Sequence, residues 1–208
     1  GMSGFPFFSH DIGGFVGDPT TDLYVRWLQF GLFSSHARIH GSARREPWDY
    51  GEEVAELAKS YLTLRYSLLP HIYSAAVESC RGGMPICKAL VLEYGDDPTV
   101  RNLDNQYLFC EDFLVAPMFQ AEGERKMYLP EGTWIDFWDQ EVFEGGRWIR
   151  RYYPLERLPL FVRGGAIVLR TEEKTEFLDH QTSWEDLMVE IYPGKSGRKV
   201  VHQAKGHT

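Results

Sequence analysis

The sequence predicts an α/β fold in its first part and an all-β fold in the rest. Over about the first 90 residues, strand-like and helix-like hydrophobic patterns alternate, which is typical of α/β proteins. From Leu114 onward, short apolar runs are separated by Gly, Pro and Asp at hairpin spacing. With 208 residues, of which 43% are hydrophobic and 25% charged, the chain is long enough to bury a globular core.

The first predicted strand is "MSGFPFFSHD", residues 2–11, an apolar run that ends in the polar pair His10 and Asp11. A helix is predicted over "DLYVRWLQFGLF", residues 22–33, because its apolar side chains recur at helical spacing. The residues that share one face of this helix are Leu23, Trp27, Phe30 and Gly31.

A second strand-like segment, "SSHARIHG", follows this helix. Its alternation places His36, Arg38 and His40 on one side. Asp11, with Phe15 just beyond it, ends the first strand in a similar way. In α/β barrels the functional groups lie at the carboxyl ends of strands. These polar and aromatic residues are therefore the candidates for a site.

Simpler explanations exist for the same residues. A charged Asp11 at the end of a buried strand is costly unless it is hydrogen-bonded or paired, so it could pair with Arg38 or cap a local turn without any catalytic role. His40 could be an ordinary core histidine. A metal site formed by His36, His40 and Asp11 is disfavoured, since the i, i+4 histidine spacing requires a helix that "SSHARIHG" does not predict. We therefore expect no metal and no cofactor.

A long amphipathic helix is predicted over residues 53–79, with a kink at Pro70 and a stop at the "RGG" of residues 81–83. Polar turn residues cluster in "EYGDDPTVRN", where we place the boundary between the two parts. The strands predicted after it lie in "FLVAPMF", "KMYLPEGTWIDFW", "RWIRRYY", "LPLFVRGGAIVL" and "DLMVEIYPG".

Composition excludes several classes of partner. The net charge of −8 disfavours nucleic acid, and no apolar run approaches the ~18 residues of a membrane span.

The N-terminus lacks the basic and apolar regions of a signal peptide. Three widely spaced cysteines without a CxxC motif are typical of reduced thiols, so we expect a cytoplasmic protein.

Several ordered motifs carry a resemblance to a known family. They are "GFPFFSHDIGGF", "FGLFSSHARIHGSARREPWDY", "YLTLRYSLLPHIYS", "LDNQYLFCEDFLVAPMF", "YLPEGTWIDFW" and "LPLFVRGGAIV". Together they resemble glycoside hydrolase family 31, which contains retaining α-glucosidases and α-xylosidases. The sequences of the motifs "SHDIGGF", "RIHG" and "DDP…LDNQY" resemble those of the bacterial α-xylosidases in particular.

The resemblance implies three units. Residues 1–95 would be the last strands and helices of a (β/α)8 catalytic barrel, residues 96–170 a proximal C-terminal β-sandwich, and residues 171–208 the truncated start of a distal β-domain. A closed barrel needs eight strands, so this barrel would be incomplete and the chain a fragment of a longer enzyme. The tail "RKVVHQAKGHT" departs from the family pattern.

The resemblance also assigns roles to the candidate residues. His40 corresponds to a histidine that hydrogen-bonds hydroxyls of the bound sugar, and Phe15 to an aromatic that lines the same pocket. Asp11 and Arg38 match positions at the pocket floor. Trp48 is a weaker candidate for the rim, since ordinary packing explains it as well. These substrate-binding residues, and no metal ligands, are the implied site.

Retaining glycosidases use two carboxyl groups, a nucleophile and an acid/base. The resemblance places both upstream of this chain, so Asp11 with Glu93 or Asp49 is not the expected pair and no catalytic residue is expected here. The predicted function is a fragment of a retaining α-glycoside hydrolase that cleaves α-xylosidic or α-glucosidic bonds in an oligosaccharide. The alternative is a structural or weak sugar-binding module. Exposed strand edges would favour a homo-oligomer.

Overall fold

The computed structural model describes residues 1–120, 123–171, 184, 186–194 and 197–203. Its first part contains, in chain order, β1 (Asp11–Ile12), α1 (Thr21–Leu32), β2 (Arg38–Ile39), the 3-10 helix η1 (Pro47–Tyr50), α2 (Glu52–Ser67) and α3 (Leu69–Gly82). The predicted alternation of strand and helix is confirmed. β1 and β2 form a two-stranded parallel sheet, so their carboxyl ends lie at the same edge.

The first strand is much shorter than predicted. The expected strand over residues 2–11 is wrong in extent, because only Asp11 and Ile12 join a ladder. In the described residues β1 pairs with β2 alone, and Gly4 turns the preceding chain with a φ of +84°. The Ser35 hydroxyl replaces part of the missing ladder: it accepts from the Phe8 amide at 2.8 Å and donates to the Phe8 carbonyl at 2.6 Å.

Helix α1 is confirmed, but of the four residues that the periodicity singled out only Gly31 is buried. Leu23 is 48% exposed. A Cβ at Gly31 would lie 2.5 Å from Cγ1 of Ile12, so the absence of a side chain lets the helix pack directly on β1. This contact decides which face points inward. The buried residues of α1 are Tyr24, Val25, Leu28, Gln29, Gly31 and Leu32.

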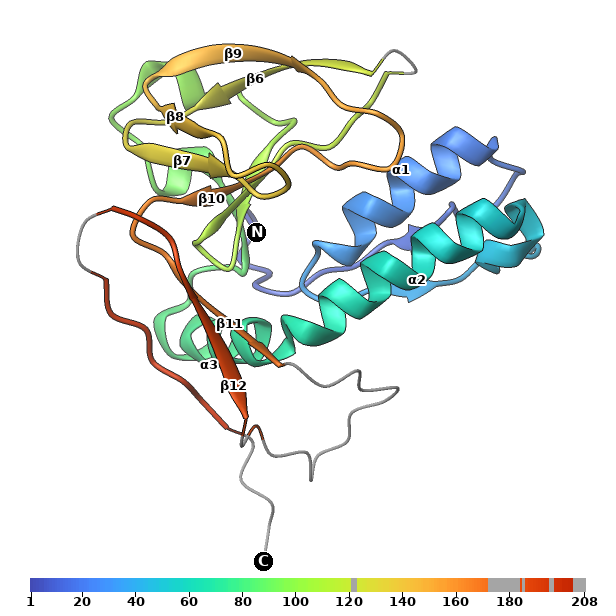
Figure 1. Cartoon of the computed structure of the whole chain (residues 1–208), viewed down its shortest axis with the longest axis horizontal. Helices are drawn as coiled ribbons and strands as arrows, with labels where there is room; N and C mark the ends of the chain where they lie inside the picture. Colours follow the sequence, from blue (N-terminus) through green and yellow to red (C-terminus); the bar gives the residue numbers. More distant parts are fainter. Residues whose placement is uncertain (121–122, 172–183, 185, 195–196, 204–208) are drawn as a thin grey trace, which may run out of the picture.

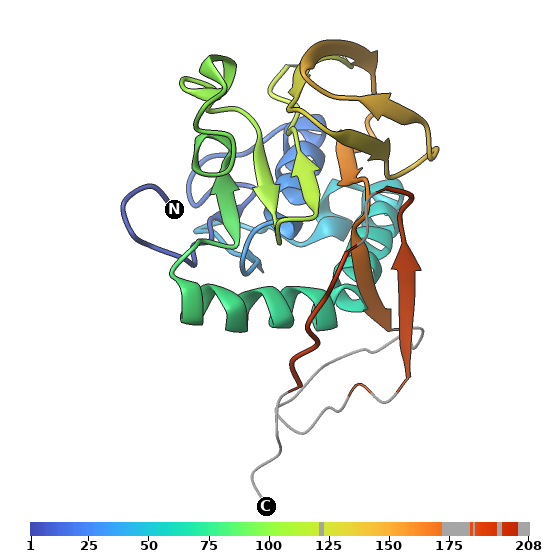
Figure 2. The same cartoon turned by 90° about the vertical axis from the view of Figure 1, so that its left-hand side faces the viewer.

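The long helix predicted over residues 53–79 is two helices rather than one kinked helix. α2 ends at Ser67 and α3 begins at Leu69, with Pro70 in its first turn. Pro70 has no amide hydrogen, and its ring would clash with the carbonyl four residues earlier, so the helix is interrupted there. α3 consequently takes a different direction from α2 (Figures 1 and 2). The predicted stop is confirmed, because Gly83 caps α3 with a φ of +79°.

The all-β part is built on a six-stranded antiparallel sheet. Its order is β3-β4-β5-β10-β7-β8, in which β10 lies between strands far from it in sequence. The strands are β3 (Cys87–Ala89), β4 (Tyr107–Phe109), β5 (Phe113–Val115), β7 (Thr133–Asp136), β8 (Val142–Glu144) and β10 (Leu160–Arg163).

Two antiparallel ribbons complete this part. β6 (Glu124–Leu129) pairs with β9 (Arg147–Tyr152), and β11 (Ile167–Thr171) pairs with β12 (Leu187–Ile191). Two of the predicted boundaries are crossed by pairing: β3 precedes residue 95 and already pairs with β4, and β12 pairs with β11 across residue 170. Of the predicted unit at residues 171–208, residues 172–183, 185, 195–196 and 204–208 lie outside the described residues. Among the described helices, none has the length and apolar character needed to span a membrane.

The six-stranded sheet is apolar on both faces, because successive residues of a strand point to opposite sides. On β5, Phe113 and Val115 enter a core shared with α1, α2 and α3. Leu114, between them, enters a second core with Met127 of β6 and Phe161 of β10. The helices therefore cover one face and the β6–β9 ribbon the other (Figure 1). The shared core joins the barrel-like part to the β part.

Candidate functional site

The two parallel strands bring Asp11 and Arg38 side by side. They are direct partners in the register, and the Arg38 guanidinium contacts Oδ1 of Asp11 through Nε and Nη2, each at 2.7 Å. The Asp11 side chain is 17% exposed and that of Arg38 60% exposed, so the ion pair lies at the surface. Of the two arrangements that the sequence allowed for Asp11, the pairing with Arg38 is present. Among the described residues, Oδ2 of Asp11 and Nη1 of Arg38 have no hydrogen-bond partner, so both can meet a ligand.

Phe15 and His40 form a second pair, in the loops that follow β1 and β2. Their ring centres are 5.6 Å apart and the rings are tilted by 46°. Both residues are exposed, Phe15 by 52%. Ser42 ties the two loops together, since its amide and its hydroxyl both donate to the Phe15 carbonyl, at 2.7 and 2.8 Å. The result is an open aromatic and imidazole surface at the end of the sheet.

His10 does not belong to this surface. Adjacent strand residues point to opposite sides, so His10 and Ile12 face α1 whereas Asp11 faces Arg38. The Trp27 indole donates to Nδ1 of His10 at 2.8 Å, and Nε2 lies 3.3 Å from the Ser34 hydroxyl. Because the indole can only donate, the neutral His10 ring carries its proton on Nε2. Burial lowers the pKa of His10, which favours this neutral form.

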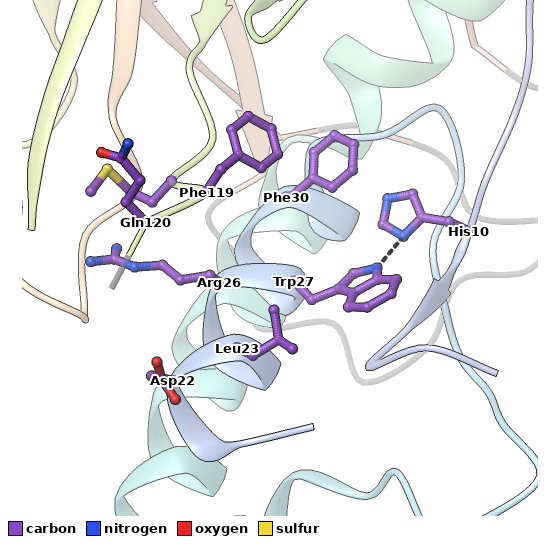
Figure 3. A pocket seen from close by; sticks show the side chains of 9 residues that line it. His10, Asp22, Leu23, Arg26, Trp27, Phe30, Phe119 and Gln120 are labelled. Atoms are coloured by element: carbon purple, nitrogen blue, oxygen red, sulfur yellow. Dashed lines mark hydrogen bonds between the residues drawn. The ribbon is translucent and has the colours of Figure 1, made fainter. Parts of the chain in front are cut away.

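Beside His10, the outward face of α1 lines an apolar groove (Figure 3). Its volume is about 490 Å³. Leu23 and Trp27 form one wall and Phe119, from the loop after β5, forms another. The groove explains the sequence pattern of α1, since the apolar stripe that does not enter the core is exposed here. The lining residues are His10, Asp22, Leu23, Arg26, Trp27, Phe30, Met118, Phe119 and Gln120.

The remaining candidates lie elsewhere. Trp48 in η1 is 69% exposed and lines a separate hollow of about 480 Å³ between η1 and α2. Glu93 is held by the Lys88 ammonium at 2.9 Å and by the Arg163 guanidinium at 3.1 Å. Those two cations hold its pKa below the usual range against the opposing effect of burial. Within the part of the chain that the structure describes, no three His, Cys, Asp or Glu side chains converge as metal ligands.

Comparison with known proteins identifies the family of this chain. Residues 1–75 match the family model described as the glycosyl hydrolases family 31 TIM-barrel domain, and residues 83–168 match the glycosyl hydrolase family 31 C-terminal domain. The chain belongs to glycoside hydrolase family 31. The first matched region of family 31 ends within α3, and the second begins just after that helix, before β3 opens the six-stranded sheet.

Individual family 31 proteins are similar over nearly the whole chain. It is 39% identical to alpha-xylosidase XylQ of Lactiplantibacillus pentosus, over 97% of this chain and 28% of that protein. It is 36% identical to alpha-glucosidase 2 of Bacillus thermoamyloliquefaciens, over 100% of this chain and 27% of that protein. A family 31 dextranase of Flavobacterium johnsoniae, complexed with glucose, superposes with a TM-score of 0.87 and 35% identity.

The superposition with the dextranase covers 93% of this chain and 25% of the dextranase chain. The chain thus spans less than a third of the length of these three family 31 proteins. Its first matched region is a portion of the family's barrel domain, in accord with the two parallel strands of the described structure.

Proposed function

We propose that this chain forms one wall of the sugar pocket of a retaining α-glycoside hydrolase that cleaves α-xylosidic or α-glucosidic bonds. The observation that carries the proposal is the exposed pair of Phe15 and His40, at the ends of the two strands that also hold the Asp11–Arg38 ion pair. Family 31 membership and the position of these residues at the carboxyl ends of barrel strands support it.

Each residue has chemistry suited to a sugar. The Phe15 ring offers an apolar face for the C–H side of a pyranose, and the His40 ring nitrogens can exchange hydrogen bonds with its hydroxyls. The Asp11–Arg38 pair supplies charge-assisted hydrogen bonds at the floor. Bonds of this kind accelerate cleavage when they strengthen as the ring gains oxocarbenium character.

We further propose that the nucleophile and the acid/base are not among residues 1–208. A retaining mechanism needs two carboxyl groups about 5–5.5 Å apart that flank the scissile bond. Asp11 is neutralised by Arg38, and Glu93 is held by Lys88 and Arg163. Asp11 belongs to the β1–β2 sheet, whereas Glu93 follows β3 of the six-stranded sheet, which supports the view that they are not a catalytic pair.

Hydrolysis and binding assays on the 208-residue chain test both parts of the proposal. Aryl α-xyloside and aryl α-glucoside should not be turned over. In an NMR titration, added xylose or glucose should shift the ring signals of Phe15 and His40. His40→Ala should raise the dissociation constant about fivefold, the equivalent of ~1 kcal/mol for one hydrogen bond. Trp148→Ala, an exposed aromatic of β9 in the ribbon on the other face of the six-stranded sheet, is the control and should leave binding unchanged.

Three results would contradict the proposal. Turnover that Asp11→Asn abolishes would mean that the chain contains its own catalytic pair. Sugar-induced shifts confined to residues away from β1 and β2 would place the pocket elsewhere. The alternative of a sugar-binding module would be favoured by two results together. The chain would bind sugar without turnover, and a complete family 31 enzyme would keep its activity when the residues equivalent to Phe15 and His40 are replaced.

A further inference from the structure

We propose that Arg45 is a positioning residue of this pocket: its buried guanidinium fixes the loop that carries Phe15 and thereby sets the spacing between Phe15 and His40. The consequence for sugar binding rests on the proposed function. The effect on the two rings is a property of the fold alone and can be measured without sugar.

Arg45 is a buried cation held entirely by backbone carbonyl groups in the described part of the chain. It is 3% exposed. Its Nε donates to the Gly14 carbonyl at 2.9 Å, Nη1 donates to the Arg44 carbonyl at 2.7 Å, and Nη2 donates to the Gly17 carbonyl. Burying a charge without a carboxylate partner is costly, so the three carbonyls must be held in place for the arrangement to be stable.

The loop that receives these bonds has little stiffness of its own. Gly13, Gly14 and Gly17 all have positive φ, between +80° and +85°. Glycine reaches this region without strain but loses the most backbone entropy when it is ordered. Phe15 lies between these glycines, so the direction of its ring depends on contacts from outside the loop. Arg45 binds the loop on both sides of Phe15, at Gly14 and at Gly17.

The Arg45 side chain also runs between the two loops that end the strands. A Cβ on Gly13 would meet its Cδ at 2.9 Å, and a Cβ on Gly41, next to His40, would meet its Cγ at 3.1 Å. Its own carbonyl accepts a hydrogen bond of 2.7 Å from the Tyr24 hydroxyl of α1. Arg45 therefore connects the helix, the loop of Phe15 and the loop of His40.

A matched control separates positioning from general stabilisation. Arg65 is partly buried, and it donates to the carbonyls of Leu32, Ser34 and Ser35 at the turn between α1 and β2. Arg65→Met removes a comparable set of bonds without touching the loop of Phe15. A role in general stability would make Arg45→Met and Arg65→Met equivalent at the pocket, whereas a positioning role would not.

The experiment compares Arg45→Met, Arg45→Lys and Arg65→Met in the 208-residue chain by NMR. Arg45→Met should remove the ring-to-ring NOE between Phe15 and His40. It should also speed amide exchange at Ser42, which donates to the Phe15 carbonyl, by about tenfold. Arg45→Lys should give a partial effect, because an ammonium cannot reach several carbonyls in one plane. Arg65→Met should leave both signals as in the wild type.

Unchanged NOE and exchange in folded Arg45→Met, or equal changes in Arg65→Met, would overturn the inference. If Arg45→Met does not fold, Arg45→Lys decides by the same two signals. Sugar binding separates this inference from the proposed function. A wild-type chain that binds neither xylose nor glucose contradicts the proposed function, while loss of the NOE in Arg45→Met still supports positioning. Where the wild type binds, Arg45→Met should weaken binding at least as much as Phe15→Ala does.

Discussion

Tyr61 links α2 to the segment that leads from β9 to β10, and loss of its hydroxyl should weaken that link. The hydroxyl donates to the Glu156 carbonyl at 2.9 Å and accepts from the Leu158 amide at 3.0 Å. The residue is 2% exposed, and its ring packs edge-on against Trp138. Tyr61→Phe keeps the ring and this contact, so the substitution removes only the two hydrogen bonds.

The expected loss of stability depends on which hydrogen-bonding groups Tyr61→Phe leaves without a partner. Leu158 is 1% exposed, so water cannot reach its amide once the hydroxyl is gone. A buried donor without a partner costs ~1–3 kcal/mol. Glu156 is exposed, and its carbonyl can bind water instead. We therefore expect Tyr61→Phe to lower the free energy of unfolding by about 2 kcal/mol, which for a chain of this size lowers Tm by about 4–8 °C.

Urea denaturation and thermal melting of the wild type, Tyr61→Phe and Tyr66→Phe measure this cost. Tyr66 lies in the same helix, and its hydroxyl has no hydrogen-bond partner among the described residues, so its loss should change stability by less than about 0.5 kcal/mol. The wild type should unfold in one transition, because one core contains residues of both parts. Equal losses in the two variants, or two separate transitions in the wild type, would refute this reasoning.

Two further predictions concern the side of β1 that faces α1. Because partial burial holds the pKa of His10 below the ordinary 6.5, the stability contributed by its neutral ring is present above that pH and is lost as the pH falls through the lower folded pKa. Urea unfolding between about pH 7.5 and 5 should therefore show a steeper loss for the wild type than for His10→Gln, and parallel curves would exclude the role of His10. Gly31→Ala should destabilise by about 1–3 kcal/mol through overpacking on Ile12, whereas Gly82→Ala, which meets nothing within 4 Å, should stabilise slightly. A higher Tm for both variants would contradict the overpacking, because it would mean that β1 moves to make room for the added methyl group.

The helices show how far local patterns determine the fold. The extent of α1 could be predicted from its periodicity, but two apolar stripes are compatible with that period. One stripe contains Leu23 and Trp27, the other Tyr24 and Leu28. The choice depends on where β1 lies, and β1 lies against Gly31 because that residue has no side chain. Tertiary packing, which no helical window contains, therefore decided the buried face.

The site shows a similar limit. The sequence placed Asp11 and Arg38 at the ends of two strands and allowed Asp11 either to pair with Arg38 or to cap a local turn, and the structure places the two residues in register. The contact between the Phe15 and His40 rings requires the conformation of two loops, which alternation does not give. Arg45 carries no signal in the sequence, because an arginine in a polar segment is normally solvated. Its burial results from the two loops closing around it.

The two sides of β1 have different roles: one packs against α1, and the other faces the proposed pocket. Ile12 and His10 face α1 and hold the strand in place, whereas Asp11 faces Arg38 and the proposed pocket. Since the ladder has only two residues per strand, backbone pairing alone cannot fix the strand, and the contacts on the α1 side must do so. Substitutions at His10 should therefore act on sugar binding only through stability. Asp11→Asn should weaken binding. It should also increase the loss of stability that His10 causes at low pH, because the Asp11 carboxylate partly offsets the lowering of the His10 pKa by burial.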